Sequence, residues 1–316
     1  MNEFDSILDG QKTPDEIKSF LIDLATRGET IDDIVNAVSS LQQRMVKISA
    51  PAGTIDCCGT GGDGSHSLNV STAVSFVVAG AGVPVAKHGN RSASSKSGAG
   101  DVLEAAGINI NVSPAQNEMA LRDIGFCFLM APQYHPALKH IAPIRKEIGT
   151  RTIFNLLGPL LNPATPARQL IGVFDQKWLE PFAGVLKQVG TARALIVNSH
   201  DGLDEISLSA PTEMVELNNG MITRKTISPA DFGLPAIQKS DIAGGDAVYN
   251  ADALMQLLNG KKSAYRDVVL ANAAACLYLA DRAQNFKDGV DIARQSIDDG
   301  KALNIFDSYR EFVKPA

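Results

Sequence analysis

Three glycines with the spacing Gly-x-Gly-x-x-Gly stand at positions 59, 61 and 64, directly after two adjacent cysteines. This spacing is typical of turns that bind the diphosphate of a dinucleotide, provided that a helix opens within the glycines and an acidic residue follows about twenty positions on. Here polar residues 65–69 come before any helix, and the next predicted strand ends in Lys87 instead of an acid. The stretch therefore predicts a loop for another phosphate, because its backbone N–H groups still suit an anion.

Hydrogen-bond donors for such an anion follow the glycines. Ser67, Asn69, Ser71 and Thr72 precede or open a predicted helix, whose dipole favours negative charge at its start. Ser71 or Thr72 is also a candidate N-cap, which is a purely structural role. A second loop, residues 87–100, follows the next strand and combines three cations with four serines. Alone it could be an ordinary surface loop, but two such loops at neighbouring strand ends favour a polyphosphate site. The cations are Lys87, Arg91 and Lys96.

Adjacent carboxylates occupy a third loop. Asp204 and Glu205 come shortly after a predicted strand over residues 194–197, and Asp201 stands nearby. Mg²⁺ is typically held by one or two carboxylates together with substrate phosphate oxygens. In isolation the loop would be interpreted as a solvated acidic turn; beside a phosphate site it predicts magnesium binding.

Residues 131–163 mix cations and histidines with apolar residues. His135 and His140 are more often structural than catalytic in such a context. Arg145, which we expect near a helix start after Pro143, could clamp a carboxylate. Lys139 and Arg151 are the remaining cations of this stretch.

The composition narrows the function classes. The chain has 316 residues and a net charge of −6, which argues against nucleic-acid binding because that needs a basic face. The N-terminus has no signal-peptide pattern, and the longest apolar run, 76–86, is too short to span a bilayer. The four scattered cysteines are expected to be reduced packing residues, so we predict a cytoplasmic protein without membrane or nucleic-acid partners.

The order of elements predicts an α/β fold. Two amphipathic helices fill the first fifty residues, the first capped by Thr13 and stopped by Gly28, the second starting after Thr30. From residue 54 onward, short apolar runs alternate with helices, which implies a mainly parallel central sheet flanked by helices. Helices are expected over 72–80, 179–189 and 267–282, and an Asn-Gly pair at 219–220 predicts a hairpin. Strands are expected at 54–59, 83–89, 126–132, 169–175 and 193–202.

This order predicts two domains. A small helical domain covers 1–52, joined by helices from about 134–162, and a larger α/β domain that binds the phosphorylated substrate covers 53–316.

The sequence resembles the anthranilate phosphoribosyltransferase family, from about Leu8 to the C-terminus. The motifs GTGGDG (59–64), NVST (69–72), KHGNR (87–91), HPALKHIAPIRKEIGTRTIFNLLGPLLNP (135–163) and DGLDEIS (201–207) occur in the family's order. The resemblance implies an Mg²⁺-dependent pentosyltransferase of tryptophan biosynthesis. Its substrates would be 5-phosphoribosyl 1-diphosphate (PRPP) and anthranilate. It also implies a homodimer, although the N-terminal region that family members use to dimerise is shorter here by about one helix.

The resemblance also assigns site residues. For PRPP these are Gly59, Gly62, Asp63, Ser67, Asn69, Val70, Ser71, Thr72, Lys87, His88, Gly89, Asn90, Arg91, Ser94, Ser95 and Ala99. For anthranilate they are Gly59, Asn90, His135 and Arg145, and for magnesium Ser71, Asp204 and Glu205. Two positions depart from the family pattern: Ser67 replaces a common threonine, and Ala99 replaces a common serine.

The implied reaction needs no strong general base, because an aromatic amine is already neutral near pH 7. No convincing nucleophile–base pair is evident, so catalysis would come from substrate placement and from stabilisation of the leaving diphosphate. Two alternatives remain. One is a pyrimidine nucleoside phosphorylase, which belongs to the same class and shares a similar glycine loop. The other is a non-catalytic homologue that binds nucleic acid.

Overall fold

The computed structural model describes residues 2–92 and 96–315, and in these residues seven strands form one sheet. The strand order is β3-β2-β1-β4-β5-β6-β7, and the pairs from β3 to β5 are parallel. The other two strands form an antiparallel hairpin, as the Asn-Gly pair predicted. The strands are β1 (Ile55–Gly59), β2 (Val85–Gly89), β3 (Phe126–Met130), β4 (Arg168–Gly172), β5 (Arg193–Ser199), β6 (Thr212–Asn218) and β7 (Met221–Ile227).

Helices connect the parallel strands and cover the sheet. The α-helices are α1 (Glu3–Leu8), α2 (Pro14–Arg27), α3 (Ile31–Gln42), α4 (Val70–Gly80), α5 (Ala99–Ala105), α6 (Pro114–Asp123), α7 (Ala131–Tyr134), α8 (Ile141–Ile148), α9 (Phe154–Leu157), α10 (Leu179–Gln188), α11 (Pro229–Phe232), α12 (Ala247–Leu258), α13 (Ala264–Leu279), α14 (Phe286–Asp298) and α15 (Lys301–Phe312). Short 3₁₀ turns are η1 (Pro136–Leu138), η2 (Gly158–Leu160), η3 (Gln176–Trp178) and η4 (Lys239–Ile242). The predicted α/β class is confirmed.

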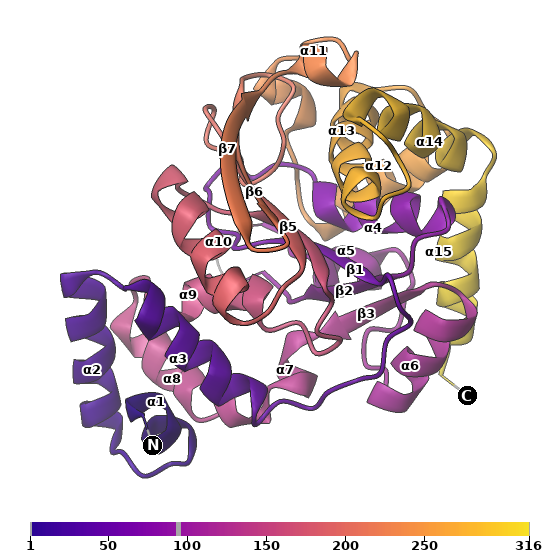
Figure 1. Cartoon of the computed structure of the whole chain (residues 1–316). Coiled ribbons are helices and arrows are strands. Elements are labelled where there is room, and N and C mark those ends of the chain that lie inside the picture. Colours follow the sequence, from indigo (N-terminus) through magenta and orange to yellow (C-terminus); the bar gives the residue numbers. More distant parts are fainter. Residues whose placement is uncertain (1, 93–95, 316) are drawn as a thin grey trace.

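The two faces of the sheet pack into different apolar cores, because successive side chains of a strand point to opposite faces. On β5, Leu195 joins the core that includes α4, α13, α14 and α15, whereas Ala194 and Ile196 join the core that includes α10. Figure 1 shows α4, α13 and α14 on one side of the sheet and α10 on the other.

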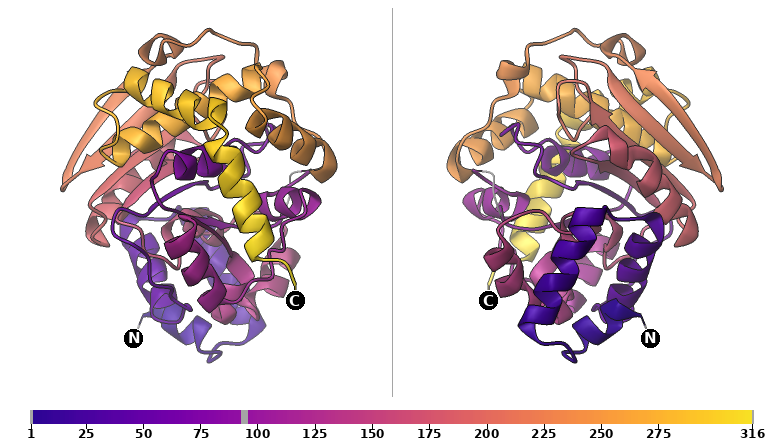
Figure 2. Two further views of the ribbon diagram at one scale, coloured as in Figure 1. Left: turned by 90° about the vertical axis from the view of Figure 1, so that its right-hand side faces the viewer. Right: turned by 90° about the vertical axis from the view of Figure 1, so that its left-hand side faces the viewer.

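The N-terminal helices extend the second core. α2 packs against α8, and α3 packs against α9 and α10. Apolar residues of α1, α2 and α3 lie in one cluster with Ile171 and Ile196 of the sheet. Figure 2 shows these helices at one end of the molecule and α12, α13 and α14 at the other. The division into a helical domain (1–52 with 134–162) and an α/β domain (53–316) stays a prediction.

Local signals explain where several helices begin. Thr13 and Glu16 form the predicted capping box of α2, and Thr30 caps α3. The predicted boundaries of two helices were wrong by a few residues: α4 starts at Val70, two residues early, and α13 spans Ala264–Leu279. Among the described residues, no helix is both long and apolar enough to cross a membrane.

One buried polar residue ties together four elements at the β3 edge. Asn117 of α6 is fully buried, and its Nδ2 donates to the Phe128 carbonyl (3.1 Å) on β3 and to the Tyr134 hydroxyl (2.8 Å) on α7. Its Oδ1 accepts from the Tyr309 hydroxyl (3.0 Å) on α15. Truncating this side chain leaves several buried polar groups unpaired, each of which is costly.

We therefore expect Asn117→Ala to lower the free energy of unfolding by about 3 kcal/mol in urea denaturation. Asn304→Ala, on the exposed side of α15, serves as the control and should change it by less than about 0.5 kcal/mol. Equal stabilities of the two variants would contradict this account of the β3 edge.

Candidate active site

Two adjoining cavities open at the carboxyl ends of the parallel strands, where α/β sheets bind ligands. The first has a volume of about 360 Å³ and the second about 540 Å³. Both are lined by Asn90, Ala131 and Arg145. The predicted residues that line the first cavity are Gly59, Gly62, Ser71, Lys87, His88, Gly89, Asn90, Arg91, Ala99 and Arg145. His135 lines the second. Ser94 and Ser95 lie outside the described residues.

The glycine loop is held against the acidic loop by a close backbone approach. Gly59 and Gly172 are paired at the ends of β1 and β4, and Asp204 packs over both. A Cβ on Gly59 would lie 2.5 Å from Asp204 Oδ2, and one on Gly172 would collide with the Asp204 carbonyl. The Gly61 N–H donates to Asp204 Oδ2 (2.9 Å). Two loops separated by about 140 residues are thus joined beside the first cavity.

The acidic loop concentrates negative charge. Burial, and then the charge of Asp63, raise the pKa of Asp204 to about 7. Burial, and then the charge of Asp204, raise the pKa of Glu205 well above its usual range. These carboxyl groups are ionised only at a cost, which a bound cation would remove. Asp201, in contrast, accepts hydrogen bonds from Ser207 and from the Leu203 N–H, so it stabilises its own loop.

The start of α4 differs from the sequence prediction in a way that suits an anion. Its N-cap is Asn69, not Ser71 or Thr72, and the Asn69 side chain makes no capping hydrogen bond. That side chain instead accepts from Asn250 Nδ2 (2.8 Å) and donates to the Ser97 carbonyl (3.4 Å). The first-turn N–H groups of α4 are therefore left without a side-chain cap.

The other predicted residues near α4 act in several ways. Lys87 is buried in β2, and its Nζ donates to the Ser71 hydroxyl (3.1 Å) and the Cys57 carbonyl (2.9 Å). Val70 and Thr72 are buried inside α4, and Thr72 Oγ1 has no hydrogen-bond partner within the described residues. Ser67 forms an isolated antiparallel bridge with Ala243.

Arg145 and Lys139 line the second cavity, and Arg145 is the more buried of these two cations. Arg145 lies in the last turn of α8, so the expectation that it would stand at a helix start was wrong: the helix begins at Ile141 and accommodates Pro143 in its first turn. Burial lowers its pKa, and no carboxylate pairs with it in residues 2–92 and 96–315. The guanidinium lies 5.5 Å from the centre of the Phe154 ring. A partly buried cation without a counter-ion suits an anionic ligand.

His88 and His135 form a buried pair between the cavities. Their rings meet edge to face with centroids 5.3 Å apart. Burial, followed by the charge of His135, lowers the pKa of His88 to about 3, and burial lowers that of His135 to about 4. His88 Nδ1 lies 3.1 Å from the Gly158 carbonyl, so this nitrogen carries the hydrogen. Both side chains are neutral at pH 7.

Comparison with known proteins decides the family. Residues 52–303 match the model of the "Glycosyl transferase family, a/b domain". An anthranilate phosphoribosyltransferase of Afipia carboxidovorans is 51% identical over 95% of this chain and 89% of its own length. One from Rhodopseudomonas palustris is 51% identical over 95% of this chain and 88% of its own length.

This chain belongs to the anthranilate phosphoribosyltransferase family. Among solved members, the enzyme of Thermus thermophilus superposes with a TM-score of 0.93 at 35% identity, covering 99% of this chain and 94% of that one. The Saccharomyces cerevisiae enzyme in complex with PRPP and Mg gives 0.89 at 29% identity, covering 98% and 90%. The sequence resemblance is thereby confirmed, and with it a pentosyltransferase activity class. Neither the nucleoside phosphorylase nor the nucleic-acid-binding alternative is supported by these relatives.

Sequence reasoning missed two residues of the site. Arg151 lies over the Phe174 ring (3.8 Å to its centre), donates to the Gly62 carbonyl and lines the first cavity. Asp56 is fully buried under Lys87; burial raises its pKa, while the Lys87 charge opposes this. Arg151 was noticed only as one more cation of its segment, and Asp56 as part of a strand. Neither had a motif that tied it to the glycine loop.

The adjacent cysteines are packing residues within the described chain, as the sequence analysis expected. Cys57 is buried, and the Cys58 thiol donates to Asp56 Oδ2 (3.3 Å). Burial raises the pKa of Cys58, so it stays a thiol rather than a reactive thiolate.

The neutral histidines predict a pH dependence of stability. Unfolding would restore a pKa near 6.5 to His135, so the unfolded chain binds a proton that the folded chain refuses until about pH 4. The stabilising contribution is present above pH 6.5 and is lost as the pH falls toward 4. We expect the free energy of unfolding of His135→Gln to fall less steeply over this range in urea titrations. The exposed variant His66→Gln should keep the wild-type slope. Identical slopes for wild type and His135→Gln would refute the buried neutral state.

Proposed function

We propose that this enzyme transfers the 5-phosphoribosyl group of PRPP to the amine of anthranilate and releases diphosphate, with Mg²⁺ as cofactor. The observation that carries the proposal is the pair of adjoining cavities, one beside an uncapped helix start and an acidic loop, the other beside an unpaired arginine. Two anionic substrates of different shape would meet where the cavities share Asn90.

PRPP would occupy the first cavity. The N–H groups at the start of α4 and of the glycine loop are donors for its diphosphate, and the helix dipole adds to their effect. Lys87 would add a buried positive charge beside Ser71. Five residues expected to contact PRPP do not line the cavity and would act by positioning the glycine loop and the start of α4; they are Asp63, Ser67, Asn69, Val70 and Thr72.

The donor set fits magnesium. Ser71, Asp204 and Glu205 offer only oxygen atoms, which is the chemistry Mg²⁺ requires, and few enough of them that substrate oxygens must complete its shell. Within the described residues there is no cluster of three His, Cys, Asp or Glu side chains, so a closed metal site of the zinc type is absent there. When bound, Mg²⁺ would neutralise charge on the departing diphosphate. The Saccharomyces cerevisiae relative complexed with PRPP and Mg supports this assignment.

Anthranilate would enter through the second cavity. The Arg145 guanidinium would pair with its carboxylate, and Asn90 would direct its amine toward the first cavity. The wall beside His135 is largely apolar, with Ile141, Leu138 and four prolines or alanines nearby, which suits an aromatic ring. The Saccharomyces cerevisiae enzyme in complex with 4-fluoroanthranilate (28% identity, TM-score 0.86, covering 98% and 90%) supports a ligand of this shape.

The chemistry requires placement more than proton transfer. The bond between the anomeric carbon and the diphosphate oxygen breaks and its electron pair leaves with the diphosphate. A carbon–nitrogen bond forms, and the proton lost by the amine passes to water. The aromatic amine is already neutral near pH 7, so the reaction needs no strong base. The low pKa values of His88 and His135, which make them weak bases, therefore do not count against it. The protein's contribution is to hold the amine in line with the breaking bond and to stabilise the developing charge.

Two further expectations belong to this proposal. A cytoplasmic location is supported by the free state of all four cysteines. A homodimer formed through the N-terminal helices, which the sequence resemblance implies, stays an expectation of this proposal.

The proposed activity is tested by mixing the protein with PRPP, Mg²⁺ and anthranilate and recording the loss of anthranilate fluorescence. We expect loss only when all components are present, with one diphosphate released per anthranilate consumed. A folded sample with no PRPP-dependent loss would contradict the proposal. Phosphate-dependent cleavage of a pyrimidine nucleoside without Mg²⁺ would indicate the phosphorylase instead.

The metal assignment predicts the behaviour of Asp204→Asn combined with Glu205→Gln. Removing both charges should raise the Mg²⁺ concentration needed for half-maximal activity by at least about tenfold or abolish turnover. The matched control, Asp15→Asn with Glu311→Gln, removes the same charge from exposed helix positions and should behave as wild type. Unchanged Mg²⁺ dependence of the first variant would refute the assignment.

A further inference from the structure

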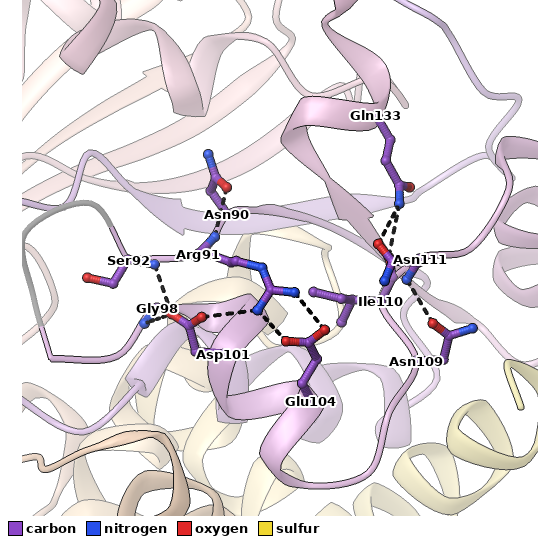
Figure 3. A network of polar contacts seen from close by, with 10 residues as sticks. All are labelled: Asn90, Arg91, Ser92, Gly98, Asp101, Glu104, Asn109, Ile110, Asn111 and Gln133. Atoms are coloured by element: carbon purple, nitrogen blue, oxygen red, sulfur yellow. Dashed lines mark hydrogen bonds and ion pairs between the residues drawn. The ribbon is translucent and has the colours of Figure 1, made fainter. Parts of the chain in front are cut away.

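One carboxylate, that of Asp101, binds two backbone N–H groups of the loop over residues 87–100. Asp101 Oδ2 accepts hydrogen bonds from the backbone N–H of Ser92 (2.9 Å) and from that of Gly98 (2.8 Å). One carboxylate oxygen thus joins the backbone of Ser92 to the backbone of Gly98. Figure 3 shows both bonds meeting at Asp101, at the start of α5. Charge-assisted bonds of this kind are stronger than neutral ones.

The two ends of the loop approach each other so closely that a side chain at position 98 is excluded. A Cβ on Gly98 would collide with the Ser92 nitrogen and lie 2.7 Å from the Arg91 carbonyl carbon and 2.9 Å from the Asn90 oxygen. The Gly100 N–H donates to that same Asn90 oxygen (3.1 Å). The Asp101 carboxylate can bind both N–H groups only in this arrangement.

Arg91 points toward the helix and uses its charge there. Its guanidinium pairs with Glu104 through both nitrogens, one at 2.6 Å from Oε1, and lies 3.4 Å from Asp101 Oδ1. Figure 3 shows the Arg91 side chain turned toward Asp101 and Glu104, with the Asn90 side chain on the other side of the backbone. A contact of this guanidinium with PRPP would require these pairs to break.

The bonds of Asp101 set one wall of the first cavity. Ser92, Gly98 and Ala99 line that cavity but not the second one, and Asp101 itself lines neither. Asn90, which lines both, is oriented by a separate bond from the Arg91 N–H to its own Oδ1 (2.8 Å). Among the described residues the Asn90 amide nitrogen has no hydrogen-bond partner, so it is available as a donor. Asp101 reaches the cavity wall through the backbone N–H groups of Ser92 and Gly98 and through its contact with Arg91.

We propose that Asp101 is a positioning residue for PRPP: it joins Ser92 to Gly98 and so holds the wall of the first cavity in its binding arrangement. The inference rests on the proposed function and deepens it. Arg91, itself paired with Glu104, stabilises the Asp101 carboxylate by charge, but the bonds to the two backbone N–H groups are the essential element.

The test compares Asp101→Asn with Glu104→Gln in steady-state kinetics. Asp101→Asn is nearly isosteric and keeps one acceptor oxygen, but it loses the negative charge, so its hydrogen bonds to the two backbone N–H groups become neutral and weaker. We expect its KM for PRPP to rise at least about tenfold, with kcat and the KM for anthranilate within about threefold of wild type. Glu104→Gln removes the same charge from the Arg91 pair but spares the backbone bonds, so its KM for PRPP should stay within about threefold.

A second variant covers the case in which Asp101→Asn does not fold. Gly98→Ala keeps the carboxylate but forces Ser92 away, and should raise the KM for PRPP selectively in the same way. Circular dichroism and thermal unfolding of each variant establish that it is folded.

The inference is overturned if a folded Asp101→Asn enzyme has a wild-type KM for PRPP, if only its kcat falls, or if Glu104→Gln raises this KM equally. The wild-type enzyme in the same assay distinguishes failure of the inference about Asp101 from failure of the proposed function. If wild type consumes no anthranilate, the function is wrong. If it does and Asp101→Asn behaves as wild type, only the present inference is wrong.

Discussion

The architecture of the site depends on the packing of Asp204 over Gly59 and Gly172. Neither glycine can be replaced without displacing Asp204, since a Cβ at either position would strike it. The approach brings the end of β1 and the loop after β5 into one place, although β4 lies between these strands in the sheet. The hydrogen bond from the Gly61 N–H then fixes the glycine loop to the acidic loop. This contact makes the N–H groups of the glycine loop neighbours of the carboxylates that we propose as magnesium ligands.

Acidic side chains and the Arg145 cation lie on different sides of the two cavities. Carboxyl groups crowd one side, where the pKa values of Asp204 and Glu205 are raised, and Arg145 stands without a carboxylate partner in the described chain on the other side. A ligand of the opposite charge would relieve each imbalance, which supports the proposal of a cation with a polyphosphate on one side and a carboxylate on the other. The histidines between them are neutral, which fits a reaction controlled by placement.

Much of the fold could be predicted because its signals are local. The capping box at Thr13, the Asn-Gly turn and the alternation of apolar runs each depend on neighbouring residues, and each is found in the structure. Element boundaries were less accurate. Ser71 has a good capping side chain, yet contacts of Asn69 with Asn250 and Ser97 move the start of α4. Those partners are far along the chain or in another loop, so no short window contains them.

Residues of the site loops could be predicted from the sequence, but the residues that hold those loops in place could not. The contiguous family motifs named many, though not all, of the residues that line the cavities. Arg151, Asp56 and Asp101 act on backbone atoms or on other side chains, and their partners are known only once the chain is folded. The helix position of Arg145 was also wrong, since Pro143 was interpreted as a helix start although it is accommodated in the first turn of α8. Supporting contacts of this kind lack a sequence signature.

The most direct test of the account is a crystal structure of this enzyme with PRPP and Mg²⁺. The account predicts that the diphosphate lies on the N–H groups at the start of α4, with the metal between it and Ser71, Asp204 and Glu205. Arg91 should still be paired with Glu104. A diphosphate bound in the second cavity beside Arg145, with no metal near Asp204, would contradict it.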